Sequence, residues 1–275
     1  ILSGEKRELH HQIAKYFETR FAAQESLYAG LIAYHYIQAG VQARIVHWSK
    51  VAADSYIHVG AFEQSRYYYQ VIVDTSSDPD EICAAELAIA EIALGQAKNT
   101  DAGKILKRYS FFTSGEAKPT IYHDFHRHQG VYIALYARFL NNQGKFKAVQ
   151  GFLQQHIAEI RDQNLYLTTR LDYLETLMFG GQLQEFEQEA LPLYKELKSL
   201  RKPMLRSKLA GVIAQYYTNI GAYKQAATFY RDKLSLAKHQ NDKLNQRIAS
   251  AGLGIVYSRL GSKTKAYKYF HQALS

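Results

Sequence analysis

The sequence is poor in residues that interrupt helices or form covalent cross-links. It has four prolines in 275 residues, and proline is the residue that most strongly disrupts a helix interior, so long helices are permitted. The single cysteine, Cys83, has no partner for an internal disulfide, which fits a reducing compartment and predicts a cytoplasmic location. No base lies near it in the sequence, so we interpret it as a small apolar helix residue.

Several functional classes lack their sequence signals. No apolar run approaches the roughly 18–20 residues of a membrane span, and the first residues do not form a signal peptide. The phosphate loop Gly-x-x-x-x-Gly-Lys-Ser/Thr is missing, and no set of Ser, His and Asp indicates catalysis. We therefore expect no membrane contact, no cofactor and no enzyme activity. Because 47% of the residues are hydrophobic, a disordered chain is also excluded.

The formal net charge of +9 is spread along the chain, with small clusters such as 195–202 near predicted helix ends. This distribution favours a solvated surface over a nucleic-acid track. Nucleic-acid binding stays an alternative that depends on charge alone, and it predicts an affinity that falls steeply with salt.

The chain does contain an internal repeat. When 210–234 is aligned with 250–274 on Gly221 and Gly261, a tyrosine stands four residues before each glycine, an alanine five after it and an aromatic residue nine after it. Such a period indicates stacked helix pairs, with a left-handed residue, usually glycine, ending the first helix of each pair. The earlier turn centres are Gly40, Gly60, Ala97, Gly144 and Gly181.

The repeat carries a family resemblance. Its best copy consists of Leu253, Gly254, Tyr257, Gly261, Ala266, Phe270 and Ala273, and a second of Ile213, Ala214, Tyr217, Gly221, Ala226 and Tyr230. These residues resemble the tetratricopeptide repeat (TPR). The resemblance implies an all-α, TPR-like α-solenoid, a right-handed superhelix of antiparallel helix pairs. Phe186 departs from the pattern, because it occupies the small-residue position of the Gly181 unit.

Reading the pattern along the chain predicts about fourteen helices, no strands and one domain over 1–275. Asp78-Pro79-Asp80 is typical of a turn with a helix start just after it. The expected subdivisions are less regular helices over 1–40, degenerate repeats over 41–110, an extended loop over 111–120 and more regular repeats over 121–275.

The first forty residues carry a second resemblance. Its residues are Glu5-Lys6-Arg7-Glu8-Leu9-His10, Ile13-Ala14, Phe17-Glu18, Leu31-Ile32-Ala33-Tyr34-His35-Tyr36 and Ala39-Gly40. This segment is similar to the junction at which the nucleotide-binding module of STAND-type signalling ATPases passes into helical repeats. The resemblance implies an upstream nucleotide-binding module and a signalling or transcription-regulating context. Because Ile1 is not a start methionine, we expect a piece of a longer protein.

Polar residues at fixed distances before each turn are the candidate groove residues. In paired-helix repeats the first helix lines the concave face, so these positions are expected to share one helical face and to bind a peptide. The candidates are Lys50, Asp54, His58, Glu91, Arg138, Asn141, Asn142, Asp172, Glu175, Gln215, Asn219 and Arg259. The Lys/Asn carboxylate clamp of some TPR co-chaperones is not recognisable.

Two further clusters have ordinary structural interpretations. His123, His126 and His128 lie close together, and the first two could share a helix face, but the flanking residues favour a helix start and we assign no metal. Three consecutive tyrosines, 67–69, face three directions on a helix, so at least one should be exposed while the others fill the core.

The combined pattern predicts a non-catalytic sensor module that binds a protein, a peptide or a small effector and belongs to a larger signalling or transcription-regulating protein. A stand-alone TPR scaffold that bridges proteins is the first alternative. The nucleic-acid-binding repeat is the second.

Overall fold

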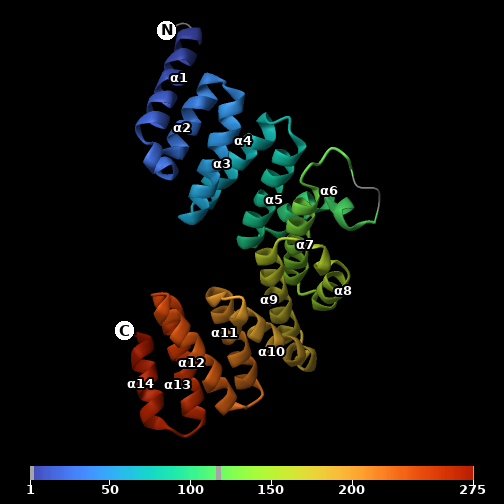
Figure 1. Cartoon of the computed structure of the whole chain (residues 1–275), viewed down its shortest axis with the longest axis vertical. Coiled ribbons are helices and arrows are strands. Elements are labelled where there is room, and N and C mark those ends of the chain that lie inside the picture. Colours follow the sequence, from blue (N-terminus) through green and yellow to red (C-terminus); the bar gives the residue numbers. More distant parts are fainter. Residues whose placement is uncertain (1–2, 116–118, 275) are drawn as a thin grey trace. The chain divides into compact units, whose positions relative to one another are not determined.

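The computed structural model describes residues 3–115 and 119–274 (Figure 1). Within these residues the chain forms fourteen α-helices and three short 3-10 helices, without a strand, as the periodicity predicts. Its contacts divide into two compact units. Unit 1 comprises residues 1–145 and 155–162, and unit 2 comprises 146–154 and 163–275.

Unit 1 is a run of consecutive antiparallel helices, each packed on its neighbours (Figure 1). The helices are α1 (Ser3–Arg20), α2 (Glu25–Ala39), α3 (Gln42–His58), α4 (Phe62–Thr75), α5 (Pro79–Gly95), α6 (Asn99–Arg108) and α7 (Phe125–Asn142). The 3-10 helices are η1 (Ala22–Gln24), η2 (Ser110–Thr113) and η3 (Ile157–Glu159).

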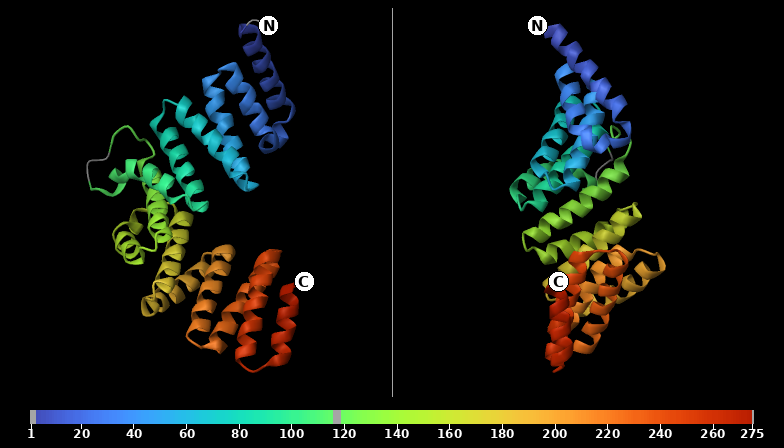
Figure 2. Two further views of the ribbon diagram at one scale, coloured as in Figure 1. Left: turned by 180° about the vertical axis from the view of Figure 1, so that it is seen from behind. Right: turned by 90° about the vertical axis from the view of Figure 1, so that its left-hand side faces the viewer.

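Unit 2 consists of seven helices among the described residues, and the left view of Figure 2 shows the last four lying side by side. The helices are α8 (Phe146–His156), α9 (Gln163–Phe179), α10 (Leu183–Ser199), α11 (Pro203–Asn219), α12 (Tyr223–His239), α13 (Lys243–Arg259) and α14 (Lys263–Leu274).

The predicted turn positions are confirmed by the backbone. All six turn glycines have positive φ values between 69° and 79°, and Ala97 has φ 59°. Glycine adopts this left-handed conformation without a Cβ clash, which explains its recurrence in the sequence. Two connections between pairs use Arg201 and Asn241 at φ 53°, and the glycine pattern did not reveal them.

The small residue after each turn lets the paired helices approach closely. Ala226 and Ala266 are buried, and the ring of Tyr230 lies so close to Gly252 that a Cβ there would be 2.5 Å from it. Phe186, at the same position as Ala226, is also buried, 4.9 Å from the ring of Tyr216. The helices α9 and α10 approach each other closely at fewer positions than α11 and α12 do.

The expectation of an extended loop over 111–120 is wrong at its beginning. Residues 110–113 form η2, and Phe112 is only 2% exposed. Its ring packs against Phe125 at 5.0 Å and Tyr132 at 5.8 Å. The nearby Ser, Gly and Pro residues suggested a loop, but burial of aromatic surface stabilises a compact turn at this place. Residues 116–118 lie outside the described residues.

Candidate functional site

A cavity of about 520 Å³ opens in unit 1 between α3, α4, α5 and α7, the helices labelled in Figure 1. Its size falls within the range of ligand-binding clefts. Each helix contributes one row of residues spaced three or four apart, because such positions share a helical face. The rows include Ala43, Val46, His47 and Lys50 on α3, Ala84, Ala88 and Glu91 on α5, and Arg127, His128 and Val131 on α7.

The floor of the cavity is made of small and aliphatic side chains. Four alanines line the cavity, of which Ala85 is buried and Ala88 half-buried, whereas Ala43 and Ala84 are exposed, and the lining residues Leu87 and Ile72 are buried. Alanine leaves space where a longer side chain would fill the cavity. The floor can therefore accept an apolar group of a ligand.

The rim carries more acidic than basic groups, although the whole chain is strongly basic. The carboxylates are Asp78, Asp80, Glu81, Glu91 and Asp124, whereas the permanent cations are Lys50 and Arg127. Glu91 is exposed and makes no hydrogen bond or ion pair within the described residues. A basic group of a ligand would therefore find an available carboxylate here.

Local sequence explains how the acidic end of the cavity is built. Pro79 begins α5, and the carboxylate of Asp78 caps the helix by accepting a hydrogen bond from Asp80 N at 2.9 Å. Both features are standard helix-start signals, so the predicted helix start after the turn is confirmed.

Asp80 connects α5 to the start of α7. Its carboxylate accepts hydrogen bonds from His123 N at 2.8 Å, from Asp124 N at 3.2 Å and from His128 Nε2 at 2.8 Å. Burial alone would raise the pKa of Asp80, but these hydrogen bonds hold the pKa below its ordinary value. The ionised Asp80 thus positions the α7 wall.

The α3 wall is held by a chain of polar contacts. Lys50 Nζ donates to Asp54 at 3.2 Å, and the hydroxyl of Tyr69 on α4 donates to the other Asp54 oxygen at 2.5 Å. Burial, followed by the hydrogen bond to Asp54, raises the pKa of Tyr69 far above its usual range. Lys50 lines the cavity, while Asp54 connects α3 to α4 one turn farther along.

The other candidates of unit 1 lie outside this cavity. His58 is exposed at the end of α3, and Arg138 lies over Gly95 of α5. Asn141 is half-buried near the end of α7. Asn142 Nδ2 donates to the Leu94 carbonyl at 3.3 Å and to Asn99 Oδ1 at 3.2 Å, so it ties α7 to the turn between α5 and α6.

The candidates of unit 2 comprise one ion-paired group and three exposed polar residues. Asp172 and Glu175 of α9 share the ammonium of Lys208, at 2.8 Å and 3.4 Å. The remaining three are exposed and make no side-chain hydrogen bond among the described residues: Gln215, Asn219 and Arg259.

Several lining residues of the unit 1 cavity were missed by the sequence analysis. His47, Ala84 and Ala88 lie one or two turns before Lys50 and Glu91 on the same helical faces, so extending each face would have found them. Asp80 and His128 are 48 residues apart, and no local pattern reveals such a pair.

The histidine cluster has a structural role. His123 lies before α7, which begins at Phe125, so the expectation that His123 and His126 share a helix face is wrong. His128 is buried against Asp80. Among the described residues, no group of three or more His, Cys, Asp or Glu side chains is placed to hold a metal ion.

The tyrosine prediction is confirmed, since Tyr67 is 55% exposed while Tyr68 and Tyr69 are buried. Cys83 is fully buried, and burial raises the pKa of its thiol to about 12. In the described part of the chain, none of the helices is long and apolar enough to cross a bilayer.

Comparison with known proteins gives two likenesses, whereas no protein-family profile matches the chain. Regulatory protein RapK of Bacillus subtilis (strain 168) is 21% identical over 226 residues, which cover 77% of this chain. The chain spans 58% of the length of RapK. The crystal structure of BtubC (BKLC) from P. vanneervenii matches with a TM-score of 0.64 at 12% identity, over 78% of this chain and 90% of BtubC.

At these identities, the structural match establishes the fold alone. Paired antiparallel helices, left-handed turn residues and the likeness to BtubC all fit a TPR-type array. The chain is an all-α solenoid.

Proposed function

We propose that this chain is a non-catalytic recognition module whose unit 1 cavity binds a peptide segment of a partner protein. The cavity between α3, α4, α5 and α7 carries the proposal, because it combines small and aliphatic lining residues with an acidic rim. An extended segment with one apolar side chain and one basic group would satisfy both. The available carboxylate of Glu91 is the proposed contact for the basic group.

Two further observations support this function. The negatively charged rim repels the phosphates of nucleic acid at this site, although the whole chain has a net charge of +9. The relative RapK bears the name of a regulatory protein, and a binding role without catalysis accords with that name. A small effector with the same two chemical groups would also fit the cavity.

The experiment is panning of a random heptapeptide library on the purified chain, followed by calorimetry with synthetic peptides. We expect enriched peptides to combine a basic with an apolar residue. Ala84→Trp, which fills the cavity from an exposed position on α5, should weaken binding at least tenfold, and Glu91→Gln should weaken peptides that carry the basic residue. Ala148→Trp, on an exposed position of α8, is the matched control.

Failure to enrich any peptide, or binding that Ala84→Trp leaves unchanged, would exclude the cavity as a peptide site.

The proposed context is a sensor region of a larger STAND-type or transcription-regulating protein in the cytoplasm. The likeness of residues 5–40 to the junction of such proteins motivates it. The coding sequence upstream of Ile1 tests it: a phosphate-binding loop within a few hundred residues is expected, whereas its absence favours the stand-alone scaffold.

A further inference from the structure

A second cavity, of about 280 Å³, lies in unit 2 between α11, α12 and α13. Its size is at the lower limit of small-molecule sites, so it suits a small ligand or a single side chain. Lys233, Ser207 and Gln240 contribute polar groups to it, with Asp242 and Asn245 at the start of α13. This cavity shares no lining residue with the proposed peptide site.

Lys233 occupies a position that is apolar after most of the other turns. Twelve residues after the other six turn centres stand Ala52, Ile72, Tyr109 and Leu193, all buried, and His156 and Ala273. The side chain of Lys233 is nevertheless only 6% exposed. Burying an ammonium without a partner is costly, so a lysine in a packing position needs an explanation.

Two facing positions on α11 have changed together with Lys233. Ser207 and Gly211 stand where the preceding pair has Leu167 and Leu171, counted back from Gly221 and Gly181. A Cβ on Gly211 would lie 3.2 Å from Lys233 Nζ, so glycine makes room for the lysine. Three buried leucines of the α9–α10 pair thus correspond, in the α11–α12 pair, to a serine, a glycine without a side chain and a lysine.

The polar groups in this cavity are incompletely paired. Lys233 forms no ion pair within the described residues, and burial lowers its pKa despite the attraction of Asp242. Ser207 Oγ and Gln240 Nε2 are buried and have no hydrogen-bond partner there. Three groups able to donate hydrogen bonds, one of them cationic, therefore line the same small space.

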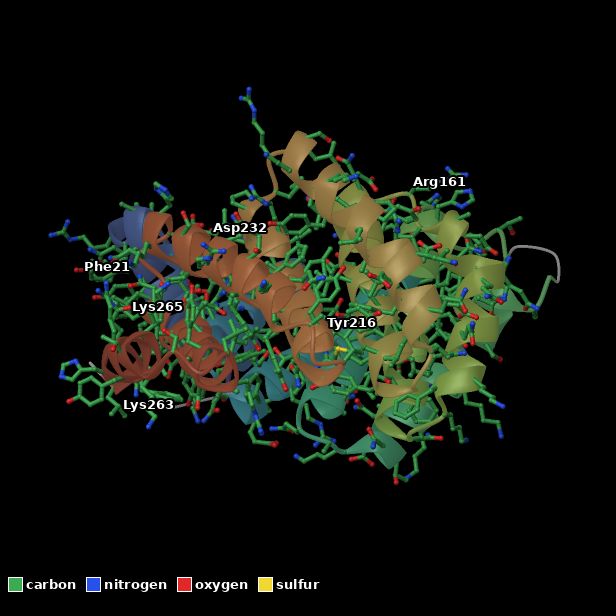
Figure 3. All side chains as sticks on the ribbon, turned by 90° about the horizontal axis from the view of Figure 1, so that it is seen from below. Phe21, Arg161, Tyr216, Asp232, Lys263 and Lys265 are labelled. Atoms are coloured by element: carbon green, nitrogen blue, oxygen red, sulfur yellow. The ribbon has the colours of Figure 1, made fainter. Side chains whose placement is uncertain are left out.

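Neighbouring carboxylates offset the charge of Lys233 only in part. Asp242 accepts hydrogen bonds from Asn245 N at 2.9 Å and from Asn245 Nδ2 at 2.6 Å at the α13 cap, and it attracts Lys233 without forming an ion pair with it. Asp232, the neighbour of Lys233 on α12 and labelled in Figure 3, instead pairs with Arg206 at 2.5 Å. Lys208 at the rim is held by Asp172 and Glu175.

We infer that this cavity is a binding site for a carboxylate group, held by Lys233 with Ser207 and Gln240 as neutral donors. A monoanion fits better than a phosphate dianion, because the repulsion from Asp242 grows with the negative charge of the ligand while Lys233 offers one positive charge. The site lies at packing positions between helices, not on the polar face of the first helices. The carboxylate group would belong either to a free small carboxylic acid or to an acidic side chain of a partner.

The test follows the Lys233 side-chain resonance of the full chain by NMR, assigned through its loss in Lys233→Leu. Sodium acetate is the first probe, sodium chloride at equal ionic strength is the control, and a terminally blocked Gly-Glu-Gly peptide is the second probe. We expect a saturable shift with acetate, with the peptide or with both, and no such shift with chloride. The probe that binds with the higher affinity shows whether the carboxylate comes from a free acid or from a peptide side chain.

Thermal unfolding provides the second measurement. Acetate should raise the melting temperature of the native chain relative to chloride, since a ligand that binds only the folded state stabilises it. Lys233→Leu should abolish this response, Ser207→Ala should weaken acetate binding about two- to tenfold as expected for one neutral hydrogen bond, and Lys238→Gln, an exposed lysine of α12, should leave it unchanged.

A space-filling role for Lys233 predicts the opposite result. If Lys233→Leu responds to acetate like the native chain, or if neither probe gives a saturable shift of the Lys233 resonance, the carboxylate site is refuted.

Discussion

In unit 2 the α9–α10 pair and the α11–α12 pair place the same helix positions against each other, but the residues differ. Leu167, Leu171 and Leu193 form part of a continuous apolar core. Their counterparts Ser207, Gly211 and Lys233 leave a cavity with polar walls. The backbone plan tolerates both, because a solenoid repeat depends mainly on contacts with its neighbours. Departure from the repeat is therefore more informative about function than agreement with it.

The two pairs also differ in the residue five positions after the turn, where the α9–α10 pair has the larger side chain. Phe186 fills the small-residue position in α10, while Ala226 keeps that position small in α12. The pair with fewer close helix contacts thus holds leucines at the three compared positions, and the pair with more close contacts holds the three residues at the cavity, although both pairs contribute to one apolar core. Close approach of helices and complete filling of the space between them are separate properties.

The largest effect is expected when the apolar pair is given the polar residue. Leu193→Lys buries an ammonium where Leu167 and Leu171 leave neither space nor partners, and we expect the free energy of unfolding to fall by about 3–5 kcal/mol. Urea denaturation measures it. A loss below about 1 kcal/mol would mean that this position can hydrate a lysine, and the contrast with Lys233 would disappear.

Phe186→Ala gives the α9–α10 pair the small residue that the α11–α12 pair has at this position. The ring is fully buried, so its removal should cost about 3 kcal/mol through lost burial and a residual cavity. Denaturation of the variant and of Phe186→Leu as its control would measure this. If both changes cost the same, α9 and α10 close over the space and packing at this position is adaptable.

Lys233→Leu gives the polar pair the residue of its neighbour. We expect it to stabilise the unliganded chain by about 1–3 kcal/mol near neutral pH, because an unpaired buried charge is replaced by an apolar group. A destabilised variant would show that the cavity cannot accept leucine. Gly211→Leu combined with Lys233→Leu would then test whether both positions must change together.

The difference in stability between Lys233→Leu and the native chain should depend on pH. The pKa of Lys233 is lower in the folded chain than its ordinary value of 10.5 in the unfolded chain, so between these values the unfolded chain binds more protons. Native stability therefore rises with pH across that window, and the advantage of Lys233→Leu should shrink as pH approaches 10.5. Urea titrations at several alkaline pH values would check this, and a constant difference would contradict it.

The smallest effects are expected at the turns, which the two pairs share. Gly221→Ala forces a Cβ into a backbone with φ 78° and should cost about 1 kcal/mol. Arg201→Gly, at φ 53° between the pairs, should change stability by no more than about 0.5 kcal/mol, because relief of strain is offset by the entropy of glycine. Thermal unfolding resolves both changes, and equal effects would contradict the prediction.

Much of the fold could be predicted from short-range pattern. Gly221, Gly261 and their earlier counterparts mark left-handed turns, and the start of α5 at Pro79 follows from Asp78. Both signals act within one helical turn, where backbone sterics and capping decide the conformation. The compact turn at Phe112 was not predictable in this way, because its partners come from later in the chain.

The candidate sites were predictable only in part. Lys50 and Glu91, proposed as groove residues from their distance to a turn, both line the unit 1 cavity, because residues at fixed distances from a turn lie on the same side of the helix. The bond between Asp80 and His128 was not found, because it joins residues 48 positions apart.

By itself the sequence determined that the chain is an all-α array of helix pairs, where its turns lie and which faces are apolar, because these depend on periodicity and local backbone preference. Only the tertiary structure decided which residues share a cavity. In the sequence, nothing distinguishes Lys233 from the other basic residues of an amphipathic helix. Its burial beside Ser207 and over Gly211 depends on how three helices pack, and such packing is set by side-chain volumes far apart in the chain.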